Sequence, residues 1–169
     1  MKTIYFVRHS KSDWDSPYST DHERGLSTRG LRNANALRKF LRARGTKVDA
    51  ALISDARRAQ ETFQILNKSS LLTKNVNVLS ELYDADQEIY LQNIHKLPDV
   101  FRSVLFLGHN PELESILNLL LGIKGTIFTK FSTSALAVLS FETDDWNKIH
   151  TEVKGTLSLH WVPSKIEKR

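Results

Sequence analysis

The sequence IYFVRHS at residues 4–10 is a continuous apolar run that ends in two basic residues and a serine. An apolar run without polar alternation is typical of a strand that is covered on both faces of its sheet. Two more runs of this kind, at residues 50–53 and 104–107, predict two more buried strands. The three runs together indicate a sheet that lies between two layers of helices.

Segments with helical periodicity lie between the predicted strands. In the first, apolar residues recur at helical spacing after the capping residue Ser27, and Gly45 ends the pattern. These apolar residues are Leu31, Ala34, Leu37 and Leu41. Further helices are predicted at residues 59–66 and 89–97 and from Asn110-Pro111 onward, and further strands at residues 76–79, 135–141 and 156–162. This alternation predicts an α/β fold, a three-layer sandwich with a mostly parallel central sheet and helices on both faces.

The composition predicts a single domain over residues 1–169. Hydrophobic residues make up 40% and charged residues 25%, a balance that is typical of globular proteins. The absence of cysteine excludes disulfides and a cysteine nucleophile, and it fits a reducing compartment. No apolar run approaches the roughly 20 residues that span a bilayer. We therefore expect a cytoplasmic protein that does not bind membranes.

The formal net charge is +5, and basic residues concentrate near the end of the first predicted helix. This basic cluster consists of Arg38, Lys39, Arg42, Arg44 and Lys47. Such runs are usually solvated surfaces. Because no basic face with interleaved aromatic residues is evident, we expect no nucleic-acid partner. The charge is compatible with an anionic substrate but does not select one.

Polar side chains follow each of the three buried strands at the point where the strand ends. Arg8, His9 and Ser10 follow the first strand, Ser54 with Arg58 follows the second, and His109 follows the third. Parallel neighbours would bring these groups to one edge of the sheet, where ligands bind in α/β folds. Arginine matches phosphate oxygens with a bidentate fork, and one histidine can act as nucleophile while the other donates to the oxygens. The sequence thus predicts a phosphate site.

These residues resemble the motifs of the histidine phosphatases. Arg8-His9-Ser10 resembles their Arg-His-Gly/Ser motif, residues 54–62 (SDARRAQET) fit the pattern Ser-x-x-x-Arg-Ala-x-x-Thr, and residues 108–111 (GHNP) resemble the second histidine motif. Residues 21–30 (DHERGLSTRG) and 131–136 (FSTSAL) are similar to segments of the small SixA-type protein-histidine phosphatases, with Gly25 in place of their usual proline. The resemblance implies a phosphoglycerate mutase-like fold and covers nearly the whole chain.

The resemblance also implies a mechanism. His9 attacks phosphorus and forms a covalent phosphohistidine, Arg8 and Arg58 hold the phosphoryl oxygens, His109 donates a hydrogen bond to one of them, and water hydrolyses the intermediate. No cofactor or metal is expected, since the other histidines lack ligand spacing. Between the adjacent arginines we choose Arg58, because it fits the motif and because Arg57 lies four residues from Glu61, its expected ion-pair partner.

Three further residues are also candidates for the site. Glu81 follows a predicted strand and is either a general acid or a surface residue. Ser10 and Arg24 are candidates for phosphate binding, although an ion pair with Asp21 accounts for Arg24 equally well.

The short segment between the second and third predicted strands implies a pocket without a lid, open to a phosphate carried by a protein. We therefore expect a phosphohistidine-bearing protein as substrate. A small phosphate ester, cleaved by a phosphomonoesterase or phosphoglycerate mutase-like enzyme of the same superfamily, is the alternative, and a non-catalytic phosphate-binding module is a further one. A haloacid-type phosphatase fits less well, because Asp13 and Asp15 lie past the end of the first strand.

Overall fold

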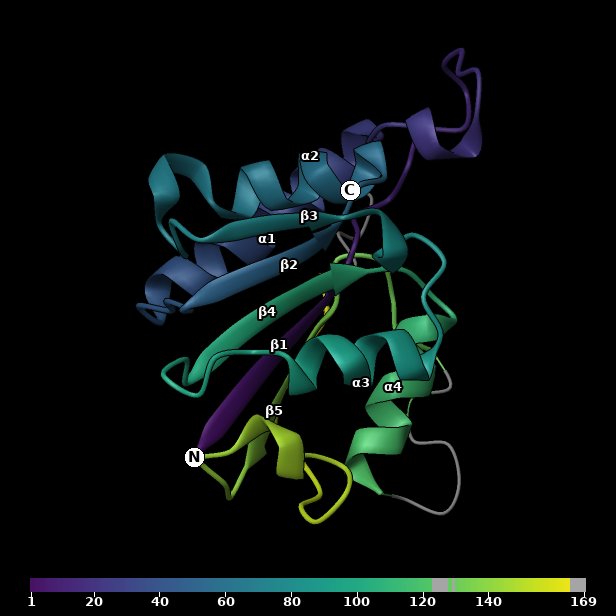
Figure 1. Cartoon of the computed structure of the whole chain (residues 1–169). Coiled ribbons are helices and arrows are strands. Elements are labelled where there is room, and N and C mark those ends of the chain that lie inside the picture. The colour runs from purple at the N-terminus through teal and green to yellow at the C-terminus, as the bar shows by residue number, and fades with distance from the viewer. Residues whose placement is uncertain (123–127, 129, 165–169) are drawn as a thin grey trace.

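The computed structural model of the chain describes residues 1–122, 128 and 130–164. Within this part, strands and helices alternate along the chain (Figure 1). The strands are β1 (Lys2–Arg8), β2 (Ala50–Ser54), β3 (Val76–Leu79), β4 (Ser103–Gly108), β5 (Leu136–Phe141) and β6 (Thr156–Trp161). The α-helices are α1 (Thr28–Ala43), α2 (Arg57–Leu66), α3 (Gln87–His95) and α4 (Glu112–Leu121), and the 3-10 helices are η1 (Asp21–Glu23), η2 (Lys68–Ser70), η3 (Ser80–Leu82) and η4 (Trp146–Lys148).

The strands form one sheet in the order β3-β2-β4-β1-β5-β6. The first four are parallel neighbours, whereas β5 runs antiparallel to β1 and β6 antiparallel to β5. Parallel pairing follows from the helical crossovers, which return the chain to the same edge before the next strand begins. The sheet confirms the predicted mostly parallel α/β fold.

Helices cover both faces of the sheet and give three layers (Figure 1). Successive side chains of a strand point to opposite faces. In β4, Phe106 belongs to the core on the side of α3 and α4, and Leu105 to the core on the side of α1 and α2. Phe106 also stacks on Phe6 of β1, with 5.8 Å between the ring centroids. Because both faces are buried, the central strands are apolar at nearly every position.

The helix α1 begins close to the segment that follows β1. The Ser27 side chain caps the helix by accepting a hydrogen bond from the Gly30 N–H at 3.1 Å. A Cβ on Gly30 would lie 2.1 Å from the Lys11 carbonyl oxygen, so only glycine permits this approach. The predicted apolar stripe is wrong at its first position, because the helix meets the main chain through Gly30 and the next residue, Leu31, is 44% exposed.

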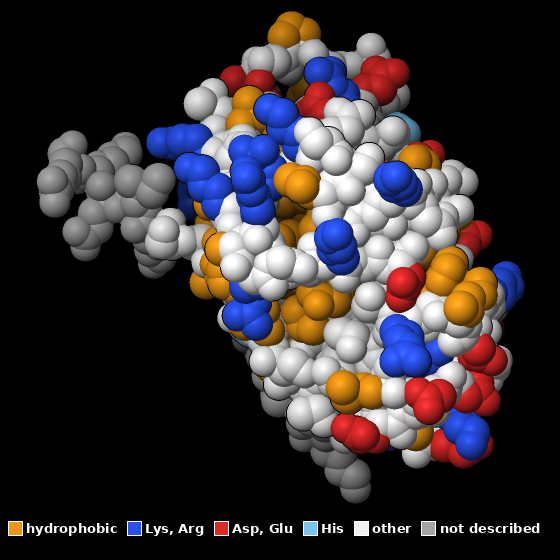
Figure 2. Space-filling model, turned by 90° about the vertical axis from the view of Figure 1, so that its left-hand side faces the viewer, with side chains coloured by type: hydrophobic (Ala, Val, Ile, Leu, Met, Phe, Trp, Pro, Cys, Tyr) orange, Lys and Arg blue, Asp and Glu red, His pale blue; other side chains and the backbone are white. Residues whose placement is uncertain are grey.

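The basic cluster lies on the surface at the end of α1. Arg42, Arg44 and Lys47 are exposed, as the sequence predicts for a solvated run. Figure 2 shows Lys and Arg side chains gathered on one side of the face that it presents.

The carboxyl ends of β1, β2 and β4 meet at one edge of the sheet. β1 is followed by a crossover to one side, through α1 to β2, and β4 returns between β2 and β1. This reversal of strand order is where an open α/β sheet leaves room for a ligand. The sequence motifs therefore lie at the position that the fold makes available.

Candidate active site

The register between β1 and β4 places two histidines side by side. Arg8 is paired with Gly108, so His9 and His109 follow at the same level of the sheet. The His9 N–H donates to the Gly108 carbonyl at 3.1 Å, and the two imidazole centroids are 5.0 Å apart. His9 is only 6% exposed and His109 only 5%. Two imidazoles thus share one buried place at the sheet edge.

The hydrogen bonding of His9 fixes its tautomer. Its Nδ1 lies 2.7 Å from the Ser10 carbonyl oxygen. A carbonyl can only accept, so Nδ1 carries the proton and Nε2 keeps a free lone pair. Burial, and after it the neighbouring His109, lowers the pKa of His9 well below its ordinary value of 6.5. The ring is therefore neutral at neutral pH, with Nε2 ready to attack an electrophile.

Arg58 lies in the first turn of α2 and points inward. It is 7% exposed, and its Nη1 donates to the Asp21 carbonyl at 2.8 Å while Nη2 donates to Asp21 Oδ2 at 3.1 Å. The preceding Arg57 points outward, with its side chain 63% exposed and its Nε 2.8 Å from Glu61 Oε1. The predicted Arg57–Glu61 ion pair is confirmed, and the inward arginine is Arg58.

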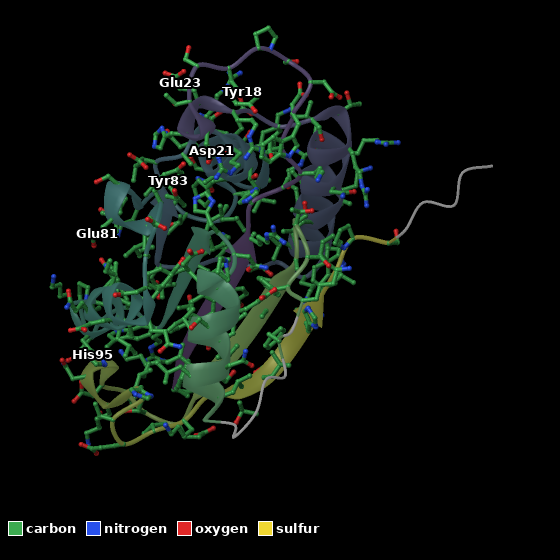
Figure 3. All side chains as sticks on the ribbon, turned by 90° about the vertical axis from the view of Figure 1, so that its right-hand side faces the viewer. Tyr18, Asp21, Glu23, Glu81, Tyr83 and His95 are labelled. Atoms are coloured by element: carbon green, nitrogen blue, oxygen red, sulfur yellow. The ribbon has the colours of Figure 1, made fainter. Side chains whose placement is uncertain are left out.

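Asp21 is the anionic partner at this edge of the sheet. Its carboxylate accepts hydrogen bonds from Arg24 Nη2 at 2.6 Å, from the Tyr83 hydroxyl at 2.7 Å and from Arg58. These bonds hold the pKa of Asp21 well below its ordinary value, so the group is an ionised carboxylate. Figure 3 shows Asp21 and Tyr83 close together in the upper part of the view, below Tyr18 and Glu23. Neither was predicted as a site residue, and the only signal for Asp21 was its spacing from Arg24.

His109 is held through Ser54, the last residue of β2. His109 Nε2 lies 2.8 Å from Ser54 Oγ, which also accepts from the Ala56 N–H at 3.2 Å. Burial and the nearby Arg58 lower the pKa of His109 to about 3, so this ring is also neutral. If the Ser54 hydroxyl donates to Nε2, both of its hydrogen-bonding functions are used and the ring proton sits on Nδ1. His109 then presents an N–H donor.

Three buried nitrogen atoms of residues around His9 have no hydrogen-bond partner in the part of the chain that the structure describes. They are Arg8 Nε, Arg58 Nε and His109 Nδ1. Arg8 spends its Nη1 on the Phe131 carbonyl at 2.9 Å, which orients the guanidinium but leaves Nε free. An unpaired buried donor costs about 1–3 kcal/mol, so such a group calls for a ligand. A phosphoryl group carries acceptor oxygens and negative charge, so it is a ligand that suits the two guanidinium groups at this place.

The other three predicted site residues, Ser10, Arg24 and Glu81, form hydrogen bonds with neighbouring side chains. The Ser10 hydroxyl is 2.6 Å from Ser134 Oγ, so it braces the loop after β1. Arg24 is buried and bonds to Asp21 and to the Ser12 hydroxyl. The ion pair with Asp21 is the alternative that the sequence offered for this residue. Glu81 is exposed and accepts from Asn93 Nδ2 at 2.6 Å, and Figure 3 shows it at the outer margin.

Glu112, the first residue of α4, is a carboxyl group that the sequence reasoning missed. Its Oε2 is buried without a partner among the described residues, and burial raises its pKa, whereas the nearby Arg8 lowers it by less. It also lines a cavity of about 520 Å³ together with Asp86, Gln87, Glu88, Pro111 and Ser115. A carboxyl group with a raised pKa is the kind that can carry a proton.

Residues 1–122, 128 and 130–164 contain no group of three His, Cys, Asp or Glu side chains placed to hold a metal ion. They also contain no helix with the length and hydropathy required to cross a bilayer.

Comparison with known proteins identifies the family of this chain. A sequence model of the histidine phosphatase superfamily (branch 1) matches residues 4–97, which is more than half of the chain. The chain belongs to the histidine phosphatase superfamily. An uncharacterized protein of Mycobacterium tuberculosis (strain ATCC 25618 / H37Rv), Rv1276c, is 32% identical over 140 residues, covering 79% of this chain and 85% of the relative.

Solved structures place this histidine phosphatase beside SixA proteins in fold. The SixA protein of Agrobacterium tumefaciens has a TM-score of 0.81 and 27% identity, covering 96% of this chain and 98% of its own. The protein histidine phosphatase SixA complexed with tungstate has a TM-score of 0.80 and 23% identity, covering 95% and 97%. A mycobacterial glucosyl-3-phosphoglycerate phosphatase complexed with VO3 shares the fold less closely, with a TM-score of 0.65, 16% identity and coverage of 94% and 98%. The predicted superfamily, SixA-like form and phosphoglycerate mutase-like fold are confirmed.

Proposed function

We propose that the chain hydrolyses phosphohistidine in a protein through a covalent phosphoryl intermediate on His9. The observation that carries this proposal is the pairing of a neutral His9, whose Nε2 is free, with buried nitrogens of Arg8, Arg58 and His109 that lack a partner. Membership in the histidine phosphatase superfamily supports phosphatase activity. The tungstate bound to the related SixA protein, a tetrahedral oxyanion, supports a site for a phosphoryl group in this fold.

In the first step, the Nε2 lone pair of His9 attacks phosphorus and the bond from phosphorus to the substrate nitrogen breaks. The substrate ring, protonated on its other nitrogen, leaves as neutral imidazole. Arg8, Arg58 and His109 donate to the three phosphoryl oxygens and stabilise the charge that they carry. The phosphorylated His9 keeps its Nδ1 proton and donates it in a hydrogen bond to the Ser10 carbonyl oxygen.

In the second step, water attacks phosphorus and His9 departs as the neutral ring with which the cycle began. The attacking water transfers one proton to the phosphate that forms, so water, phosphate and His9 account for every atom and proton of this step. Positioning and charge stabilisation are the main demands of phosphoryl transfer, and the residues named here meet both.

The leaving group favours a phosphohistidine substrate. An imidazole departs readily, whereas a serine or sugar oxygen needs a proton donor. Asp21 is ionised and Glu81 bonds to Asn93 on the surface, so neither is placed to be that donor.

The proposal also places the reaction in the cytoplasm, because a chain without cysteine fits a reducing compartment.

One observation favours the alternative of a small phosphate ester. Glu112 combines a raised pKa with a position on the cavity of about 520 Å³, and it lies near Arg8. A proton donor beside a cavity of that size would suit an ester leaving group.

The two substrates are separated by comparing kcat/KM for a carrier domain phosphorylated on histidine with kcat/KM for phosphoglycerate. The proposal expects a clear preference for the carrier domain, no effect of Glu112→Gln on it, and loss of both activities in His9→Ala. A preference for phosphoglycerate, with loss of that activity in Glu112→Gln, would establish the alternative. Binding of phosphate without any turnover would make the chain a phosphate-binding module.

A further inference from the structure

The loop between β1 and α1 carries two exposed aromatic side chains. Trp14 is 58% exposed and Tyr18 is 43% exposed, and their rings meet edge to face with 6.4 Å between centroids. The loop projects from the body of the molecule at the upper right of Figure 1, and Figure 3 shows Tyr18 near its outer end, above Asp21 and Tyr83. Single exposed apolar residues are ordinary, but two aromatic rings in contact make a small patch.

This pair is connected to the candidate active site by direct contacts. The Arg24 guanidinium lies 3.4 Å from the Trp14 ring centroid and 5.9 Å from that of Tyr18. Arg24 lies beneath the Trp14 ring and is only 5% exposed. Its Nη2 donates a hydrogen bond to the Asp21 carboxylate at 2.6 Å. Asp21 in turn binds Arg58. The aromatic pair therefore stands at the rim of the site, three successive contacts from Arg58, which faces the phosphoryl group in the proposed function.

We propose that Trp14 and Tyr18 form a docking surface for the protein that carries the phosphorylated histidine. This inference rests on the proposed function. His9 is 6% exposed, so a phosphoryl group attached to a protein reaches it only if the surface around that group lies against the rim. Tryptophan and tyrosine are among the residues that contribute most at protein interfaces, and here the two rings are in contact, with Arg24 beneath Trp14. A small ester has no surface that reaches this loop.

The charges of the loop define the partner further. Asp15 and Glu23 are exposed and form no ion pair with another described residue. A partner with an apolar patch next to its phosphohistidine and basic groups around that patch fits the loop by charge complementarity.

The test compares two substrates in variants of the loop. Tyr18→Ala removes the ring that meets Trp14 edge to face and whose centroid lies 5.9 Å from the Arg24 guanidinium, and Trp14→Phe keeps an aromatic ring over Arg24. The control is Val100→Ala, which changes a residue that is 80% exposed and lies three residues before β4, at the amino ends of the parallel strands and away from the site. The substrates are a carrier domain phosphorylated on histidine and para-nitrophenyl phosphate.

We expect KM for the phosphorylated domain to rise about tenfold in Tyr18→Ala and by less in Trp14→Phe, since truncated interface anchors typically cost at least this much. We expect hydrolysis of para-nitrophenyl phosphate to stay at the wild-type rate in all variants, and Val100→Ala to match the wild type on both substrates. Wild-type rates on both substrates in both loop variants would overturn the docking surface. A parallel loss on both substrates would also overturn it, because the loop would then act through Arg24 alone. Failure of the wild type to cleave the phosphorylated domain would instead refute the proposed function itself.

Discussion

Replacing Arg58 by lysine keeps the positive charge at the site but removes the guanidinium fork. In the structure two of its five N–H donors are spent on Asp21, one on the main-chain oxygen and one on the carboxylate, and the Nε donor has no partner among the described residues. A lysine ammonium is a point charge with three donors on a flexible stem, so it cannot hold Asp21 at two points and also reach a phosphoryl oxygen.

The size of the effect follows from the loss of one positioned donor. Removing such a donor from a developing negative charge lowers kcat by roughly 10²- to 10³-fold, which corresponds to about 3–4 kcal/mol. We expect Arg58→Lys to lose about this factor in kcat for para-nitrophenyl phosphate. The stability of this variant should change little, because Asp21 keeps Arg24 and Tyr83 as partners and the Asp21 side chain is 48% exposed.

The adjacent Arg57 supplies the matched control. Arg57→Lys alters only a surface ion pair with Glu61, which contributes at most about 1 kcal/mol to stability. Steady-state hydrolysis of para-nitrophenyl phosphate and urea unfolding should show a wild-type rate and near wild-type stability for this variant. An undiminished rate in Arg58→Lys, or an equal loss in Arg57→Lys, would refute the assignment of the inward arginine.

Three more predictions concern other parts of the structure. Glu81→Gln should hydrolyse para-nitrophenyl phosphate within about twofold of the wild type, because Glu81 bonds to Asn93 on the surface, and a large loss would return it to the pocket. His109 has a folded pKa of about 3 against an ordinary 6.5, so the unfolded chain binds the extra proton between these values and stability falls with acid. Urea unfolding at pH 5 and 7 should show that wild type loses about 2 kcal/mol more than His109→Gln, and equal losses would contradict this linkage. In Gly30→Ala the new Cβ meets the Lys11 carbonyl oxygen at 2.1 Å, so thermal unfolding should show a loss of about 1–3 kcal/mol, whereas an open helical glycine would give a gain.

Much of the fold is readable from the sequence because the central strands are buried on both faces. That burial demands apolar residues at consecutive positions of β1, β2 and β4, and each run stops where the chain leaves the sheet. The residues just past those ends, including His9 and His109, must then lie near one another if the strands are parallel neighbours. The Arg57–Glu61 pair was predictable for a similar reason, since helical spacing alone brings the two side chains together.

Individual side-chain hydrogen bonds between distant segments leave no local pattern in the sequence. Asp21 binds Arg58 across 37 positions and Tyr83 across 62 positions, and no local pattern records either bond. Glu81 was placed near the site by its position after β3, yet the orientation of η3 turns its side chain toward Asn93 on α3. The partner of a side chain is decided by packing of the whole chain, which a local motif does not contain.

The most direct measurement is the position of the phosphoryl group on the enzyme during turnover. A reaction quenched in base within its first turnover and analysed by tandem mass spectrometry and NMR should show one phosphoryl group, on Nε2 of His9, because Nδ1 is committed to the Ser10 carbonyl. His9→Ala should trap none. A phosphoryl group on another residue, or on Nδ1 of His9, or turnover with no covalent intermediate at all, would contradict the account.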